Sequence, residues 1–141
     1  MVLSQQSLRA GFSVIELMFY TLIVGILLGG AVAGFNTILE KSRKSATNSS
    51  LRVIKQAVDT YYGEVQPSRY PETLEDLIVK PEGVSNWDGP YLDAKGGMIP
   101  KDGWGADFVY ERTPGGVHPY NLYSYGKKGE EAEEEDWISA W

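Results

Sequence analysis

The chain has 141 residues, 43% of them hydrophobic and 23% charged, with a formal net charge of −6. These averages fit one soluble domain and exclude a multi-span membrane protein and a disordered chain. The lack of Cys excludes disulfides and thiolate sites. The acidic balance argues against a nucleic-acid-binding surface. The averages hide an asymmetry, because residues 1–50 carry a net charge of +2 and residues 51–141 a net charge of −8.

A long uncharged run dominates the N-terminal part of the chain. Leu17–Leu39 are 23 consecutive uncharged residues, most of them apolar. As a helix rising ~1.5 Å per residue, the run would be roughly 35 Å long and could cross the ~30 Å hydrocarbon layer of a bilayer. It is too long for the core of a signal peptide, and no A-x-A-like cleavage site follows it. We therefore predict a retained membrane helix; the alternative is a buried core helix of a soluble domain.

Glu16 interrupts the apolar segment that begins at Phe12. An ionised carboxylate near the centre of a bilayer costs roughly 3 kcal/mol or more, so Glu16 is expected to pair with a cation. No basic residue lies within one helical turn of it, and the nearest is Arg9. A partner from another chain or a newly made amino terminus would satisfy it. The alternative is a carboxylate that reaches the aqueous edge of the membrane.

The residues around Glu16 resemble a processing site. Gly11-Phe12-Ser13-Val14-Ile15-Glu16 is similar to the site at which type IV pilins and type II secretion pseudopilins are trimmed. The resemblance implies that a prepilin peptidase cuts between Gly11 and Phe12 and that the new amino group of Phe12 is N-methylated. It also implies that Glu16 pairs with that amine in a neighbouring subunit, and that the leader lies in the cytoplasm.

Four glycines lie within the predicted membrane helix, and they form two G-x-x-x-G spacings: Gly25, Gly29, Gly30 and Gly34. Small residues at this spacing let membrane helices approach closely, whereas each glycine weakens a helix by about 1 kcal/mol relative to Ala. Pilin-like helices commonly carry a Pro at the position of Ala33. Our hypothesis is that Gly29-Gly30 provides the point of local unwinding instead, the alternative being small residues that merely face lipid.

The helix is expected to continue beyond the membrane segment. No helix breaker follows Glu40, and apolar residues recur at helical spacing: Leu51, Ile54, Val58 and Tyr61. Gly63 is a plausible stop. One helix from about Phe12 to Tyr62 would be roughly 75 Å long, and its second half would bury one stripe against a head.

The remaining residues predict a small sheet. A short helix within 68–77 would be capped by Thr73 with Asp76 as capping-box partner. Residues 106–112 read as a strand, Pro114-Gly115-Gly116 as a turn and 120–125 as the partner strand. The predicted fold is α+β and pilin-like, a long N-terminal helix packed on a small antiparallel sheet. The predicted parts are a leader (1–11), a membrane and filament-core helix (12–40) and a head (41–141) that includes the second half of the helix.

Aromatic and acidic residues of the head are interpreted as structural. Five aromatic side chains are expected in the core rather than at a ligand: Trp87, Tyr91, Trp104, Phe108 and Tyr110. Asp88 and Asp102 lie in turn sequences and are expected to form Asx turns, and His118 beside Pro119 is expected in a turn. The sequence shows no Ser/His/Asp triad, paired carboxylates or phosphate-binding loop.

The order and spacing of four head segments sharpen the resemblance. They are Arg69-Tyr70-Pro71, Asn86–Leu92, Pro100–Gly105 and Phe108-Val109-Tyr110. Together they are similar to the major, G-type pseudopilin of type II secretion systems, although that family usually has Pro where Gly103 stands. Type IV pilins usually end in a Cys-bridged loop, which a chain without Cys cannot form.

The acidic segment 127–136 holds six carboxylates and two ammonium groups. Calcium takes 6–8 oxygen ligands. The resemblance implies a calcium-binding loop here, with these candidate ligands: Tyr125, Glu133, Glu134, Glu135 and Asp136. The loop is shorter than in the family, and Lys128-Gly129 stands where the family has Asp-Gly. The alternatives are that Lys127 or Lys128 replaces the metal by pairing with the acidic residues, or that the segment is a solvated charge run.

The expected function is that of a non-enzymatic structural subunit. The resemblance implies a homopolymer that forms a periplasmic filament in type II secretion and helps export folded proteins. Its partners would be minor pseudopilins, the prepilin peptidase and the inner-membrane secretion platform. The expected location is the bacterial inner membrane, crossed once, with the head in the periplasm. The alternatives are a type IV pilin for adhesion, motility or DNA uptake, and a membrane-anchored periplasmic enzyme or binding module.

Overall fold

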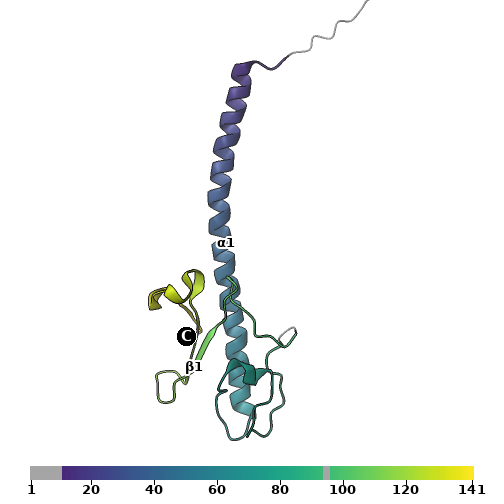
Figure 1. The fold of residues 1–141 in the computed structure, drawn as a ribbon, viewed down its shortest axis with the longest axis vertical. Helices are drawn as coiled ribbons and strands as arrows, with labels where there is room; N and C mark the ends of the chain where they lie inside the picture. The colour runs from purple at the N-terminus through teal and green to yellow at the C-terminus, as the bar shows by residue number, and fades with distance from the viewer. Residues whose placement is uncertain (1–10, 94–95) are drawn as a thin grey trace, which may run out of the picture. The chain divides into compact units, whose positions relative to one another are not determined.

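The helix α1 runs from Val14 to Glu64 in the computed structural model, which describes residues 11–93 and 96–141, with the backbone alone at 31–33 (Figure 1). The chain divides into two compact units, Met1–Leu39 and Glu40–Trp141. Apart from Gly11, the predicted leader lies outside the described residues. The elements are one long helix, short 3₁₀ turns and a small antiparallel sheet, which confirms the predicted α+β, pilin-like fold.

The end of α1 differs slightly from the prediction. Gly63 does not stop the helix, which continues to Glu64, and the N–H of Val65 still donates to the carbonyl of Tyr61 at 3.1 Å. A single glycine costs only about 1 kcal/mol in a helix, so it does not end one by itself. The chain leaves the helix where the backbone of Gln66 pairs with Ser85 through two 3.0 Å hydrogen bonds.

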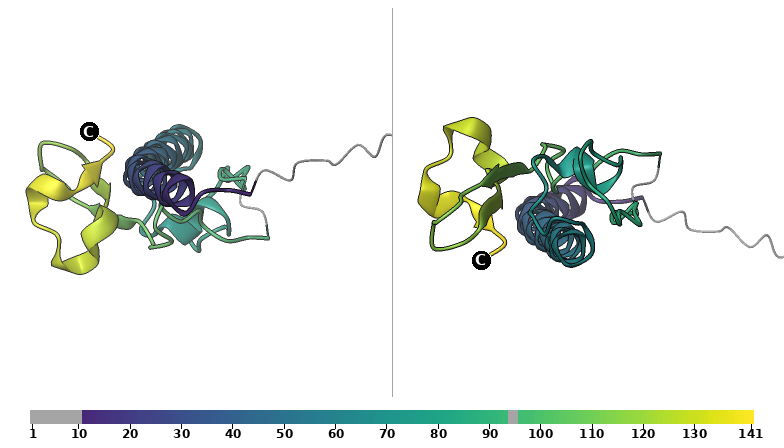
Figure 2. Two further views of the ribbon diagram at one scale, coloured as in Figure 1. Left: turned by 90° about the horizontal axis from the view of Figure 1, so that it is seen from above. Right: turned by 90° about the horizontal axis from the view of Figure 1, so that it is seen from below.

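The second half of α1 supplies one side of the core of the head. The four residues predicted to form its apolar stripe are all at most 1% exposed: Leu51, Ile54, Val58 and Tyr61. They belong to one cluster with Tyr120 and Leu122 of the sheet and with Leu74 and Leu77 of the connecting segment. Views along α1 show the sheet and the C-terminal loop on one side of the helix. The segment that follows α1 lies against a different side of it (Figure 2).

The sheet has three antiparallel strands in the order β1-β2-β3: β1 Val109–Arg112, β2 Tyr120–Ser124 and β3 Ile138–Ser139. Val109 lies opposite Tyr123, and Ser124 lies opposite Ile138. The first strand is shorter than predicted because the backbone of Ala106 pairs with Asp102 instead of with a strand. The sequence did not predict β3, since two residues carry too little pattern to be recognised.

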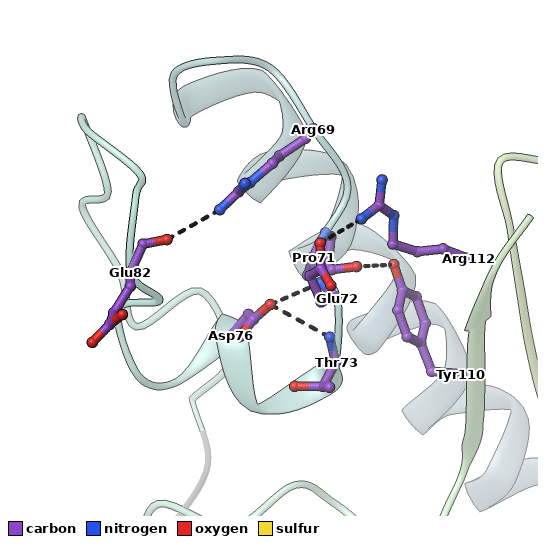
Figure 3. Close-up of polar contacts among 8 residues, drawn as sticks. All are labelled: Arg69, Pro71, Glu72, Thr73, Asp76, Glu82, Tyr110 and Arg112. Carbon is purple, nitrogen blue, oxygen red and sulfur yellow. Dashed lines mark hydrogen bonds and ion pairs between the residues drawn. The ribbon is translucent and has the colours of Figure 1, made fainter. Parts of the chain in front are cut away.

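The short helix η1, Leu74–Leu77, ties the connecting segment to the sheet. Its Asp76 carboxylate accepts hydrogen bonds from the N–H groups of Glu72, at 2.7 Å, and Thr73, at 3.4 Å, so Asp76 acts as the predicted capping partner (Figure 3). Tyr110 of β1 donates its hydroxyl to the carbonyl of Pro71 at 2.9 Å. Arg112 of β1 pairs with Glu72 at 2.8 Å.

The five aromatic residues expected in the core lie there. Phe108 is buried, and the other four are half-buried and packed against the core cluster. The two largest fully buried side chains are Tyr61, which was predicted in the buried stripe of α1, and Tyr120, which was not among the residues expected in the core. Both stand in regular elements where periodicity alone marks a position as buried without saying what it touches.

Candidate functional site

The N-terminal unit exposes its apolar side chains. Those of the described residues between Phe12 and Leu39 are exposed, and none of the most apolar 18-residue window of α1 is buried. A surface this apolar is not stable in water, because burying it is favourable by about 25 cal/mol per Å². Among the residues that the structure describes, one helix, α1, is long and apolar enough to span a membrane.

Glu16 lies in the first turn of α1 and is exposed. In that position the unpaired N–H groups and the helix dipole favour a carboxylate by about 0.3–1 kcal/mol, much less than the cost of placing it in lipid. None of the ion pairs in the part of the chain that the structure describes includes Glu16. Gly11 and Phe12 precede the helix, so the predicted scissile bond lies in non-helical backbone.

The four glycines of the predicted membrane segment have open space around them. A Cβ added at any of them would meet no atom within 4 Å: Gly25, Gly29, Gly30 and Gly34. The helix continues through Gly29 and Gly30 without interruption. Among the described residues, therefore, no contact requires these four positions to be glycine.

The loop that contains Gly103 packs directly on α1. The N–H of Gly103 donates to the hydroxyl of Thr47 at 2.9 Å, and that hydroxyl donates to the carbonyl of Arg43 one turn earlier, also at 2.9 Å. Thr47 is fully buried. A Cβ on Gly103 would lie 2.3 Å from the Arg43 carbonyl oxygen, which real structures do not tolerate. In this arrangement only glycine fits, and a Pro at this position would also lack the N–H that reaches Thr47.

Asp102 organises the neighbouring backbone and is not available for chemistry. Its side chain is buried, and one carboxylate oxygen accepts from the N–H groups of Trp104, at 2.9 Å, and Ala106, at 2.8 Å. The other oxygen accepts from the hydroxyl of Ser124 at 2.6 Å, and Ser124 in turn accepts from the N–H of Gly126 at 2.9 Å. The expected Asx turn is confirmed, and it is linked to the start of the C-terminal loop.

The C-terminal loop consists of two 3₁₀ turns, η2 Gly126–Glu131 and η3 Glu134–Asp136, followed by β3. Trp137 holds it against the outer face of the sheet: its ring stacks on Tyr123 with centroids 4.2 Å apart and meets Tyr125 edge-on at 5.6 Å. The indole N–H of Trp137 donates to the carbonyl of Ala132 at 3.1 Å. The loop is thus folded by its own aromatic and backbone contacts.

The residues predicted to bind calcium are not gathered around one point. Asp136 pairs with Lys128, Nζ to Oδ2 at 2.5 Å, while Glu133, Glu134 and Glu135 are exposed. Among the residues that the structure describes, no group of three or more His, Asp or Glu side chains could hold a metal ion. An ammonium at a candidate ligand repels a cation. Calcium binding therefore stays a prediction, and the residues as placed do not fit it.

His118 lies in the hairpin turn, as expected, but its main contact was missed. Its ring stacks on Trp141 with centroids 4.1 Å apart and planes 8° from parallel. Lys55 of α1 places its ammonium 3.4 Å from the centroid of the Trp141 ring. The indole N–H of Trp141 donates to the carbonyl of Tyr120 at 3.2 Å. The Trp141 ring thus joins α1, the hairpin and the end of the chain. No local pattern in the sequence indicates these contacts.

Comparison with known proteins places this architecture in one family. The sequence profile described as "Type II secretion system (T2SS), protein G" matches residues 36–141. Curated relatives named "Type II secretion system core protein G" include that of Pseudomonas aeruginosa, which is 33% identical over 90% of this chain and 89% of the relative. The relative of Escherichia coli is 31% identical over 94% of this chain and 91% of the relative. The relative from Vibrio cholerae is 30% identical over 89% of this chain and 86% of its own.

These matches confirm the predicted role in type II secretion, and they do not favour the type IV pilin or the membrane-anchored enzyme. Membership of a secretion system also implies assembly with other components of that system. The chain belongs to the type II secretion system protein G family, whose members are structural pseudopilin subunits and not enzymes.

Proposed function

We propose that this chain is the major subunit of a periplasmic pseudopilus, which it forms by polymerising through its N-terminal helix to drive export of folded proteins across the outer membrane. The observation that carries the proposal is the exposed apolar first half of α1 with Glu16 in its first turn, in a chain of the protein G family. An apolar surface of this extent needs lipid before assembly and other helices after it.

The proposed maturation begins at the bond between Gly11 and Phe12. The prepilin peptidase hydrolyses this amide and leaves a free amino group on Phe12, which is then N-methylated. The methylated amine remains protonated at neutral pH, so it supplies the cation that Glu16 lacks. The non-helical backbone of Gly11 and Phe12 supports this step, because a protease needs its substrate bond outside a helix.

Glu16 would then set the axial register of the filament. In a low-dielectric core an unpaired carboxylate is strongly disfavoured, so a new subunit is held only where its charge meets the Phe12 amine of a neighbour. The precursor would cross the inner membrane once, with residues 1–11 in the cytoplasm and the head in the periplasm. Further partners would be the minor pseudopilins and the inner-membrane secretion platform.

The test replaces Glu16 in cells that carry the whole secretion system. Glu16→Ala is expected to insert into the membrane normally but to lose subunit polymers and secretion by about 100-fold or more. The exchange leaves the Phe12 amine of a neighbouring subunit as an unpaired buried charge, which costs about 3–5 kcal/mol. Membrane fractionation, cross-linking between subunits and the amount of exported protein in the medium are measured. Intact mass of the assembled subunit checks that residues 1–11 are absent and that one methyl group is present.

The matched control is Glu75→Ala, which removes an exposed carboxylate of the head and should leave insertion, polymers and secretion unchanged. Glu16→Gln keeps the shape and removes the charge, so it should fail as Glu16→Ala does. Normal filaments from either Glu16 variant would refute the proposed role of this carboxylate.

A further inference from the structure

The C-terminal loop carries two adjacent lysines, and each of them pairs with a carboxylate. Lys128 pairs with Asp136, the last residue of η3, at 2.5 Å. Lys127 pairs with Glu40 of α1 at 3.0 Å, between Nζ and Oε1. The acceptor carboxylates are 37% and 38% exposed and the lysine side chains 68% and 61%, so both pairs lie at the surface with one partly shielded partner.

The two ends of the loop already lie together in this arrangement. The N–H of Gly126, at the start, is held by Ser124, and a Cβ on Gly126 would lie 3.7 Å from the carbonyl oxygen of Asp136, at the end. Trp137 then closes the loop by stacking on Tyr123. Among the ion pairs of the described residues, Asp136 is the one candidate ligand of the closed loop that is paired, and its charge is compensated by the ammonium of Lys128.

We infer that the ammonium groups of Lys127 and Lys128 act in place of a bound cation: Lys128 closes the C-terminal loop on Asp136, and Lys127 fastens the loop to α1 at Glu40. An ammonium is a compact cation with three N–H donors, so it can neutralise a carboxylate at hydrogen-bond distance much as a metal ion does. It also repels a divalent cation from the same carboxylate. The head therefore folds without calcium.

The first experiment measures thermal unfolding of the full chain in detergent, with calcium and with a chelator. The two midpoints should agree within about 1 °C, since no bound ion contributes to stability. Terbium, a calcium substitute that is excited by a nearby tryptophan such as Trp137, should give no saturable emission. A midpoint that falls by several degrees on chelation, or saturable terbium emission, would overturn the inference.

The second experiment exchanges the charge at Lys128. Lys128→Asp should lower the midpoint by about 2–6 °C, because it replaces an ion pair with repulsion from Asp136. Calcium should restore part of the loss, since the exchange recreates a pair of neighbouring carboxylates. The matched control is Lys101→Asp, which breaks the exposed pair of Lys101 with Asp107 at 3.0 Å and should change the midpoint less, with no response to calcium.

A milder variant keeps the inference testable if Lys128→Asp does not fold. Lys128→Gln should be cut several-fold faster than the wild type by a protease specific for Glu, within 130–135, because the loop opens more often. Lys101→Gln provides the control and should be cut at the wild-type rate. Equal cleavage of the Lys128→Gln and wild-type loops would contradict a closing role for Lys128.

Discussion

Gly103 shows at the scale of one residue how the head is fixed to the helix. Its backbone approaches α1 so closely that its N–H reaches Thr47 and any Cβ would collide with the Arg43 carbonyl. In sequence terms Gly103 is only a departure from the family's usual Pro. In the structure it is the residue that lets the loop lie against the helix, and Thr47 is buried because the loop covers it.

We predict that Gly103→Ala destabilises the protein by about 1–3 kcal/mol, because the new methyl group forces the loop away from α1 and strains the contact with Thr47. Equilibrium denaturation of the full chain in detergent measures this. Gly63→Ala is the control: it adds the same methyl group to α1 where nothing lies within 4 Å, so it should be neutral or stabilise by up to about 1 kcal/mol. Equal effects of the two exchanges would show that the close approach at Gly103 is not rigid.

At the scale of elements, α1 carries two different tasks along one helix. Its first half is apolar all round and exposed, whereas its second half buries a single stripe against the sheet. The change of pattern needs no break in the helix, since the backbone hydrogen bonds are the same in both halves. The glycines at 25, 29, 30 and 34 lie only in the half that has no internal packing to satisfy.

Our hypothesis that Gly29-Gly30 is a point of local unwinding can be separated from a role in close helix contact. Replacing both residues by Ala keeps the side chains small but strengthens the helix by about 1 kcal/mol per position, whereas replacing both by Leu also adds bulk. If unwinding matters, both double variants should form fewer filaments, as counted by cross-linking and electron microscopy. If only close approach matters, the Leu variant alone should fail. Unchanged filaments in both would count against either role.

At the scale of the whole molecule, the head is held together by tyrosines from different segments. Burial is the main cause that raises the pKa of Tyr110, and the nearby Arg112 only partly opposes it. Burial likewise raises the pKa of Tyr120, with a further contribution from Asp59. The rings of these two residues lie 5.4 Å apart, and each contacts another part of the chain. Ionising either residue would place a charge inside the core.

These tyrosines predict a loss of stability at alkaline pH. In the unfolded chain a tyrosine ionises near its usual pKa of 10.0, whereas in the folded head Tyr110 and Tyr120 stay neutral to higher pH. Their contribution to stability is therefore complete below pH 10 and is lost as the pH rises above it toward the folded pKa. Thermal midpoints measured between about pH 8 and about pH 11 should fall in the upper part of this range.

The control for this pH dependence is Tyr110→Phe. It removes one ionisable group together with the hydrogen bond to Pro71, so its midpoint should be lower at neutral pH and should fall less steeply above pH 10. An alkaline slope identical to that of the wild type would assign the effect to other groups, such as the lysines.

The sequence by itself determined the features that depend on neighbours along the chain. The uncharged run, the predicted processing motif at Gly11-Phe12 with Glu16, the helical spacing from Leu51 to Tyr61 and the hairpin around Pro114-Gly115-Gly116 are all local patterns. The helix and the hairpin are present as predicted, although α1 runs past Gly63 and the first strand is shorter than predicted. The periodicity suffices for the fold class, because it decides which face of an element is buried. The family was indicated by the resemblance of the motif around Glu16 and of four head segments.

Only the tertiary structure decided which distant groups meet. The contact of Gly103 with Thr47 joins residues 56 positions apart, Lys55 and His118 reach Trp141 from two elements, and the two-residue strand β3 exists only because β2 offers it a partner. The same holds for Lys128, whose pairing with Asp136 across the C-terminal loop is one of several pairings that the charges alone allow. These contacts depend on how closely backbones approach in space, and that distance is set by the packing of the whole head and not by any segment of it.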